Sequence, residues 1–156
     1  MEGQSWLGRR QQHFDFQAKA RIAFVPNSVC EEAGLTVFQN VNHHYEVALT
    51  CRDQACRLIV RRTIGTLTAE VASIPIPHGP LTLVIEGNAA KYSLGYVSGD
   101  SVVNILAKGE TRYLSTEVGG RFTGVYLAMY ATANGQQSDN AAQFDWFEYK
   151  ACNESK

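Results

Sequence analysis

The sequence His43-His44-Tyr45-Glu46 is the densest cluster of residues that could do chemistry in this chain. Side chains alternate between the two faces of a β-strand, so His44 and Glu46 share a face if this segment is extended. An imidazole beside a carboxylate could contact a sugar or contribute ligands to a metal ion. Two ligands at alternate positions do not complete a metal site. We therefore favour the other interpretation, a hydrogen-bonded surface pair at the start of a strand.

Four cysteines form the second candidate group. Cys51 and Cys56 flank the turn sequence Arg52-Asp53-Gln54-Ala55 between two strand-like runs. A hairpin there would bring their Cα atoms within disulfide reach, and a disulfide would favour an oxidising, extracellular compartment. Cys30 and Cys152 could pair with each other or stay free. Zinc binding is disfavoured because the chain has no Cys-x-x-Cys motif and no paired Cys/His set.

Other catalytic and ligand-binding motifs are missing from the sequence. No Gly-x-Ser-x-Gly elbow supports a serine nucleophile. Gly119-Gly120 lacks the Lys-Ser/Thr and the helical pattern that follow a phosphate loop. Asp145 or a loop acid could hold a structural calcium ion, but no loop is rich in acidic ligands. We therefore expect no cofactor, with a structural calcium ion as the remaining option.

The overall charge excludes two classes of partner. The chain has 14 Lys and Arg residues against 15 Asp and Glu, for a net charge of -1. This balance argues against an electrostatic nucleic-acid or anionic-membrane binder.

No apolar run approaches the roughly 20 residues of a transmembrane helix, and the polar N-terminus has no signal-peptide core. A chain of 156 residues fits one domain that buries its own core.

The elements that position these residues are predicted to be strands. Residues 14–25 alternate cleanly between apolar and polar, and the expected inward face consists of Phe14, Phe16, Ala18, Ala20, Ile22 and Phe24. Further strand-length runs fall at 32–39, 44–50, 57–63, 66–74, 81–86, 91–97 and 102–107. Gly34 within one of them indicates a bulge or a close backbone approach. About nine or ten short strands, with turns between them, indicate an antiparallel sandwich or barrel.

The segment 116–150 contains two more apolar runs on either side of a polar, turn-rich loop. This arrangement predicts a strand pair. Both runs carry apolar or aromatic residues on each of their two faces, whereas a half-buried strand alternates apolar and polar. In the second run, alternation places two aromatic pairs on opposite faces, Phe144 and Trp146 against Phe147 and Tyr149. We expect both strands to be covered twice, by the core and by a second sheet, a ligand or a partner domain.

Several motifs, in order along nearly the whole chain, resemble one protein family. They are Leu7-Gly8-Arg9-Arg10-Gln11-Gln12-His13, residues 31–40, Asn42-His43-His44-Tyr45-Glu46, residues 117–130 and residues 144–150. Together they resemble the C-terminal domain of family 43 glycoside hydrolases, the β-xylosidases and α-L-arabinofuranosidases. The resemblance implies an all-β, concanavalin A-like (jelly-roll) antiparallel β-sandwich over residues 1–156. The family domain normally begins several strands before the first motif, so we expect an N-terminally shortened domain.

The resemblance also implies an accessory role beside a catalytic five-bladed propeller, which carries the catalytic acids of the family. In those enzymes a loop of the sandwich leans over the active site, and its aromatic residue shapes the sugar pocket. Phe122, between Arg121 and Thr123, matches that position, and Gly119-Gly120 permits positive φ and close approach. The expected substrate of such an enzyme is a xylo-oligosaccharide or an arabinoside. In the other interpretation, Phe122 tucks into its own core.

No catalytic residue is expected in this chain. A retaining glycosidase of this fold needs two or three acids at alternate positions on one strand face. Glu31 and Glu32 are adjacent, and Asp145 and Glu148 are three apart, so each pair points to opposite faces. Enzyme activity of the chain alone stays an open question, and a small glycosidase is the least favoured function.

A free-standing carbohydrate-binding module for xylo-oligosaccharides is the alternative function. Aromatic side chains would then form a sugar-stacking surface, drawn from Tyr45, Tyr92, Tyr96, Tyr126, Tyr130 and Trp146. The sugar contacts that we single out are His44, Glu46, Tyr126 and Trp146. If the first strands of the sandwich are missing, an open sheet edge should remain, so we also expect homo-oligomers.

Overall fold

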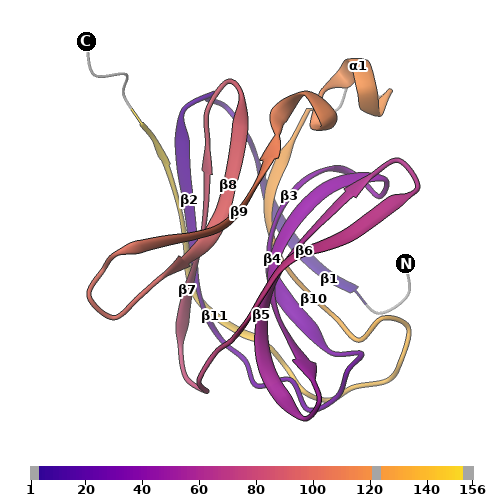
Figure 1. Ribbon diagram of the computed structural model, residues 1–156, viewed down its shortest axis with the longest axis vertical. Helices are drawn as coiled ribbons and strands as arrows, with labels where there is room; N and C mark the ends of the chain where they lie inside the picture. The colour runs from indigo at the N-terminus through magenta and orange to yellow at the C-terminus, as the bar shows by residue number, and fades with distance from the viewer. Residues whose placement is uncertain (1–3, 121–123, 153–156) are drawn as a thin grey trace.

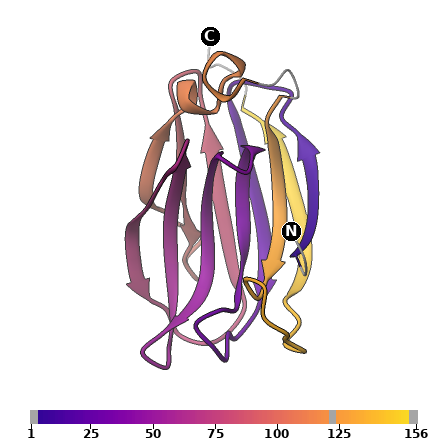
Figure 2. The ribbon, with the colours of Figure 1, turned by 90° about the vertical axis from the view of Figure 1, so that its right-hand side faces the viewer.

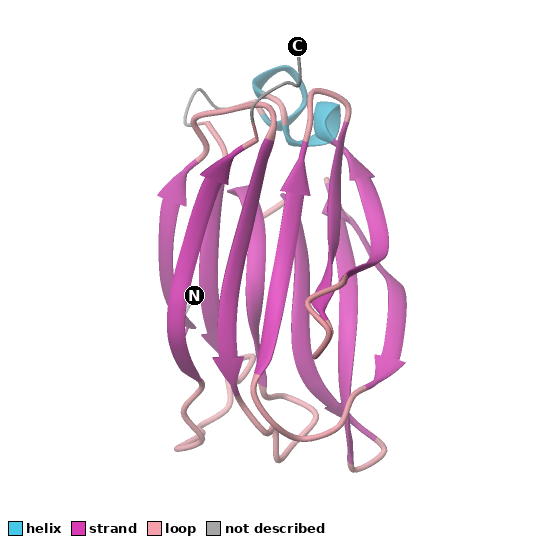
Figure 3. Ribbon diagram, turned by 90° about the vertical axis from the view of Figure 1, so that its left-hand side faces the viewer, coloured by secondary structure: helices cyan, strands magenta, loops and turns pink. Residues whose placement is uncertain are grey.

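The computed structural model describes residues 4–120 and 124–152, most of which form two antiparallel β-sheets packed face to face (Figures 1 and 2). The strands are β1 (Gln4–Arg10), β2 (Phe16–Ala23), β3 (Glu32–Asn40), β4 (His43–Arg52), β5 (Ala55–Ile64), β6 (Leu67–Pro75), β7 (Leu81–Gly87), β8 (Lys91–Val97), β9 (Val103–Glu110), β10 (Tyr126–Thr132) and β11 (Gln143–Ala151). Two short helices, η1 (Thr111–Leu114) and α1 (Thr116–Gly119), lie together at one end of the sandwich (Figure 3). Within the described ranges, no helix has the length and hydropathy to cross a membrane.

One sheet has six strands in the order β1-β10-β3-β4-β5-β6, and the other has five in the order β11-β2-β7-β8-β9. Every neighbouring pair is antiparallel. The predicted all-β sandwich is therefore confirmed. The predicted hairpin is also present, because β4 pairs with β5 in a register that sets Cys51 opposite Cys56.

Apolar side chains from both sheets fill the space between them. Phe16, Ala18, Ala20 and Ile22 are buried on β2, as the alternation predicted, and Phe24 follows them. The facing sheet contributes fully buried residues that include Leu35, Tyr45, Leu49, Leu58 and Leu127. Each large apolar side chain that leaves water contributes about 1.5–3 kcal/mol, so this core holds the sheets together.

Phe14 is an exception to the predicted inward face. Its side chain is 76% exposed, because β2 begins only at Phe16 and residues 11–15 form the connection from β1. Alternation continues through a connecting segment in the sequence, but the backbone there is not held in a sheet. The prediction that Phe14 packs in the core is therefore wrong.

The predicted strand pair within 116–150 is also wrong. β10 lies between β1 and β3 in one sheet, whereas β11 is the edge strand beside β2 in the other. The polar connection between them crosses from sheet to sheet and is held by the Glu31 carboxylate, which accepts hydrogen bonds from Ser138 Oγ (2.6 Å) and Asn140 Nδ2 (2.7 Å).

The prediction that both faces of each strand are covered is confirmed for β10 and wrong for β11. Leu127 and Ala128, which point to opposite faces of β10, are both fully buried. In β11 the register shifts between Phe144 and Trp146, so alternation breaks at this bulge. Phe144 consequently packs against the core with Phe147 and Tyr149, whereas Trp146 points outward and is 40% exposed.

Candidate functional site

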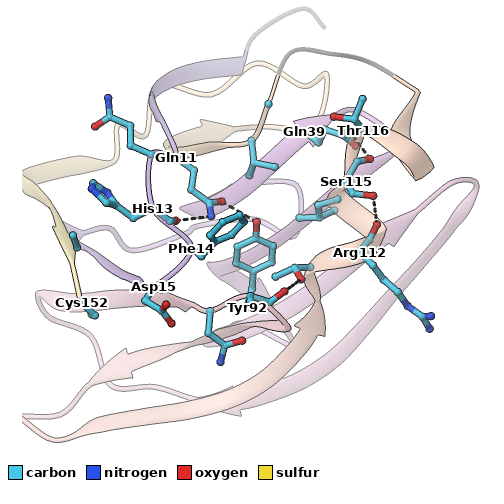
Figure 4. A pocket seen from close by; sticks show the side chains of 18 of the residues that line it. Gln11, His13, Phe14, Asp15, Gln39, Tyr92, Arg112, Ser115, Thr116 and Cys152 are labelled. Carbon is cyan, nitrogen blue, oxygen red and sulfur yellow. Dashed lines mark hydrogen bonds between the residues drawn. The ribbon is translucent and has the colours of Figure 1, made fainter. Parts of the chain in front are cut away.

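A hollow of about 1000 Å³ opens at the end of the sandwich that carries α1 and η1 (Figure 4). Its walls come from the β1–β2 connection, the β7–β8 turn, the two short helices and the residues after β11. Glu117 and Gly124, on either side of residues 121–123, both line it. The predicted pocket residues Arg121, Phe122 and Thr123 lie outside the described residues, so their expected contact with sugar stays a prediction.

The floor of this end hollow is polar and ordered by hydrogen bonds. Tyr92 donates its hydroxyl to Gln11 Oε1 (2.8 Å), and Gln11 Nε2 donates to the His13 carbonyl oxygen (2.9 Å). Burial raises the pKa of Tyr92, so its hydroxyl stays protonated and serves as a donor. The rim, in contrast, presents Phe14 to solvent, and α1 nearby exposes Val118 (46%).

Two amides at the end of β3 fix the short helices above the end hollow. Gln39 Nε2 donates to the Ser115 carbonyl oxygen (2.9 Å), and Asn40 Nδ2 donates to the Gly119 carbonyl oxygen (3.2 Å). Gly119 packs directly on the Gln39 amide, since an added Cβ would lie 1.7 Å from Gln39 Oε1. Gly120 then adopts φ 70°, the left-handed conformation that glycine favours. The backbone is therefore anchored up to the residue before position 121.

Gln39 also carries an unsatisfied atom. Across 4–120 and 124–152, its Oε1 is the buried side-chain oxygen or nitrogen without a hydrogen-bond partner. Such an atom is costly to bury, and it lies in the wall of the end hollow. Gln39 was not predicted as a site residue, because a glutamine at the end of a strand gives no signal of this kind.

His44 and Glu46 share the outer face of the six-stranded sheet, as predicted. His44 Nε2 lies 3.4 Å from Glu46 Oε2. They are not a surface pair, however, because the Glu46 side chain is only 7% exposed. Burial raises the pKa of Glu46 to about 7 and lowers the pKa of His44. The expected surface pair is therefore a largely buried one.

Glu46 belongs to a larger network that the sequence did not predict. Arg61 on β5 donates to Glu46 Oε1 on β4 and to both Glu32 oxygens on β3, one at 3.1 Å, while the Tyr130 hydroxyl on β10 donates to Glu32. Two acids thus do meet on one sheet face. The search along single strands could not find them, because they come from neighbouring strands. One guanidinium binds both carboxylates, so the arrangement is an ion network and not a hydrolytic acid pair.

The remaining predicted sugar contacts are not brought together. Tyr126 lies on β10 in the six-stranded sheet, whereas Trp146 lies on β11 in the other sheet. Of the six aromatic residues proposed as a sugar-stacking surface, Tyr45, Tyr92 and Tyr130 are buried. The structure thus does not form the proposed common surface, because three of the six rings are buried and Tyr126 and Trp146 lie in different sheets.

The four thiols are all free in this structure. Cys51 and Cys56 are buried and face each other across the β4–β5 hairpin, but no disulfide joins them. Cys30 precedes β3, whereas Cys152 follows Ala151, which pairs with Phe16 at the start of β2. Because β2 runs the length of the sandwich, Cys30 and Cys152 lie at opposite ends and do not pair.

Asp145, the acid considered for calcium, lies 3.9 Å from the Arg21 guanidinium. No group of three or more His, Cys, Asp or Glu residues that could hold a metal ion is found in the part of the chain that the structure describes. The structural calcium ion stays a prediction.

Comparison with known proteins gives one consistent family. Residues 1–150 match the family model of the β-xylosidase C-terminal concanavalin A-like domain. The chain is 35% identical over 147 residues to the non-reducing-end α-L-arabinofuranosidase of Bacteroides ovatus, a match that covers 94% of this chain and 28% of that protein. It is 26% identical over 143 residues to a xylosidase/arabinosidase of Butyrivibrio fibrisolvens, covering 92% of this chain and 28% of that protein.

Solved structures give the same fold. A family 43 protein from the xyloglucan utilisation locus of Bacteroides ovatus superposes with a TM-score of 0.89 at 35% identity, covering 95% of this chain and 29% of that chain. The xylan β-1,4-xylosidase of Bacillus halodurans superposes with a TM-score of 0.84 at 23% identity, covering 94% and 30%. The chain thus spans less than a third of the relatives that it matches.

Proposed function

Because this chain belongs to the family of concanavalin A-like domains found at the C-terminus of β-xylosidases, we propose that it packs on the catalytic propeller of such an enzyme and supplies residues 121–123 to the sugar pocket. The predicted fold and the accessory-domain assignment are confirmed by this membership. The docking surface, the role of Phe122 and the substrate are the parts that we propose.

The end hollow carries the proposal. It is a recessed surface with an ordered polar floor, and an apolar side chain, Phe14, stands at its rim with 76% of its area exposed. An exposed aromatic residue beside a hollow is typical of an anchor that a partner surface buries. Glu117 and Gly124, which line the same hollow, stand before and after residues 121–123 in the sequence, and this supports docking at the hollow.

The substrate of the assembled enzyme is proposed from the relatives. Those compared above are named as an α-L-arabinofuranosidase and a xylosidase/arabinosidase. We therefore propose a terminal arabinofuranosyl or xylosyl unit as the sugar that Phe122 helps to enclose. The catalytic acids would come from the propeller, and Phe122 would exclude water and limit the shape of the pocket.

Reconstitution from two separate parts tests this proposal. The chain would be mixed with the catalytic part of the Bacteroides ovatus relative, and complex formation would be measured by titration calorimetry together with the hydrolysis of aryl arabinofuranoside and xyloside. Phe14→Asp should abolish the complex. Val102→Asp is the matched control, because Val102 is 51% exposed but lies in the β8–β9 turn, away from the end hollow.

The Phe122→Ala variant distinguishes docking on the catalytic part from enclosure of the sugar. We expect this variant to bind the catalytic part as the wild type does, while kcat/KM falls by about tenfold or more. Binding that is unaffected by Phe14→Asp would overturn the docking surface. Activity that is unaffected by Phe122→Ala would overturn the enclosing role.

A further inference from the structure

A second, smaller hollow lies on the outer face of the six-stranded sheet. It has a volume of about 370 Å³, and its lining includes Trp6, Phe38, His44, Glu46 and Tyr130. We call it the face hollow. Small-molecule sites usually begin at roughly 300 Å³, so this one suits a single ring-sized ligand. The core of the sandwich lies on the other side of the sheet, so the face hollow is separate from the interior.

One wall of the face hollow is aromatic. Trp6 on β1 is 42% exposed and is braced edge-on by Phe38 (ring centroids 6.0 Å apart) and by Tyr126 (5.8 Å). Its indole also lies over Gly8, where an added Cβ would meet the ring at 2.6 Å. The indole is therefore held in place while part of its surface stays open to solvent. A fixed, partly exposed indole is a platform on which an apolar ring face can stack.

The facing wall offers two hydrogen-bond acceptors. The Asn40 carbonyl oxygen can only accept, so His44 Nδ1 donates to it at 3.2 Å and the neutral ring keeps a lone pair on Nε2. That nitrogen faces Glu46 Oε2 at 3.4 Å, while Arg61 occupies the other oxygen, Oε1. The Glu46 carboxyl, whose pKa burial raises to about 7, loses its proton near neutral pH, and its Oε2 and His44 Nε2 are then both acceptors. Because both residues line the face hollow, a ligand hydroxyl there can donate to either atom.

The charges of the network select the kind of donor. Arg61 already neutralises one of the two carboxylates. A metal ion would have to share Glu46 with the guanidinium, and an anion would meet two carboxylates. A neutral molecule with hydroxyl donors and one apolar face fits both walls.

We propose that the face hollow binds one sugar ring of a neutral polysaccharide, stacked on Trp6 with neighbouring hydroxyls donating to Glu46 Oε2 and His44 Nε2. This site does not rest on the docking function, since it uses a different surface and different residues. It replaces the scattered set of predicted sugar contacts with one compact group, to which Trp6 and Phe38 are added and from which Trp146 is removed.

Intrinsic fluorescence of two single-tryptophan variants tests the site. The chain has two tryptophans, Trp6 and Trp146, which are 42% and 40% exposed and lie in different sheets. Trp146→Phe leaves only Trp6, and Trp6→Phe leaves only Trp146. The probes are xylotriose, arabinotriose, cellotriose and mannotriose. We expect at least one of them to change the Trp6 emission with a saturable curve and a Kd on the order of 1 mM, and none to change the Trp146 emission.

Two further measurements keep the proposal falsifiable if a variant folds poorly. In the wild-type chain, the two indole N–H signals in a ¹H–¹⁵N spectrum report on Trp6 and Trp146 separately, and only that of Trp6 should move with the probe. His44→Phe removes one acceptor and should weaken binding by about tenfold. The proposal is overturned if no probe gives a saturable Trp6 response, if the Trp146 signal moves equally, or if His44→Phe binds like the wild type.

Discussion

At the scale of single residues, Arg61 is the side chain on which the outer face of the six-stranded sheet depends. It is 24% exposed and binds Glu32 and Glu46, which are 4% and 7% exposed. The three residues sit on β5, β3 and β4, so the network ties three strands through side chains. Buried ion networks of this kind are costly to break, because removal of one partner leaves charge without compensation.

Arg61→Met should therefore destabilise the fold strongly. Both carboxylates would lose their guanidinium, and we expect the free energy of unfolding to fall by about 3–5 kcal/mol in urea denaturation. Arg112→Met is the matched control, because Arg112 pairs with Glu110 at 2.7 Å in a largely exposed bridge. The control should lose much less, because solvent-exposed ion pairs contribute little to stability. Equal losses in the two variants would contradict the role of burial.

Glu46 should make stability depend on pH. Its pKa is about 7 in the folded chain against an ordinary value of 4.5, so the folded state binds more protons between these values. Its contribution to the free energy of unfolding is therefore present at low pH and lost as pH rises toward about 7. His44, whose pKa is lowered, contributes with the opposite sign at acidic pH.

A comparison with Glu46→Gln isolates this group, because both chains keep His44. We expect the wild-type advantage in free energy of unfolding to shrink by roughly 3 kcal/mol between about pH 4 and about pH 8. Urea denaturation at a series of pH values measures it. A constant difference across that range would show that burial does not govern the Glu46 carboxyl.

At the scale of strands, Gly34 shows how closely β3 and β4 approach. An added Cβ would lie 2.2 Å from the Val47 carbonyl oxygen, a backbone atom that cannot turn away. The close approach predicted for Gly34 is thus confirmed, and the β3–β4 register shift lies elsewhere, between Phe38 and Asn40.

Gly34→Ala should consequently strain the sheet. We expect a loss of about 1–3 kcal/mol, as for overpacked cores, measured as a lower urea midpoint with an unchanged slope. Gly99→Ala is the control, because nothing lies within 4 Å of its added Cβ. A Gly34→Ala chain as stable as the control would contradict the close approach.

Local patterns predicted most strands well, and pairing between distant strands poorly. The predicted run 91–97 coincides with β8, and the β4–β5 hairpin follows from its turn residues. The placement of β10 and β11 in different sheets was not predicted. A polar loop has the same composition whether it connects two paired strands or crosses from one sheet to the other. The bulge before Trp146 and the Arg61 network depend on cross-strand register, which one strand's sequence does not contain. The role of Phe122 rests on the family resemblance and stays a prediction.

At the scale of the whole molecule, β1 leaves one side of the sandwich open. All seven of its residues are exposed, β10 pairs with only one of its edges, and Leu7 is 69% exposed. Among the strands that the structure describes, none pairs with its other edge, where another strand could approach. The self-association expected from the sequence remains a prediction, and β1 is where the described part of the chain would support it.

Sedimentation at increasing concentration tests this expectation. We expect the wild-type chain to form dimers, and Leu7→Lys to shift the equilibrium toward the monomer, because a charge on an edge strand opposes pairing. Val29→Lys, at a similarly exposed position of 68% outside the sheets, is the control. A wild-type chain that stays monomeric at the highest concentration would refute the prediction.

In each sheet, a strand from the beginning of the chain pairs with a strand from its end. β1 pairs with β10 and β2 with β11, and the Gln12 amide reaches the Tyr149 hydroxyl across 137 residues of sequence. Contacts between such distant segments close large loops, which slows folding. During synthesis, β1 and β2 therefore cannot pair with β10 and β11 until these last strands have left the ribosome. Any domain made earlier in the same polypeptide would be folded by then, so its surface could guide the final closure of this one.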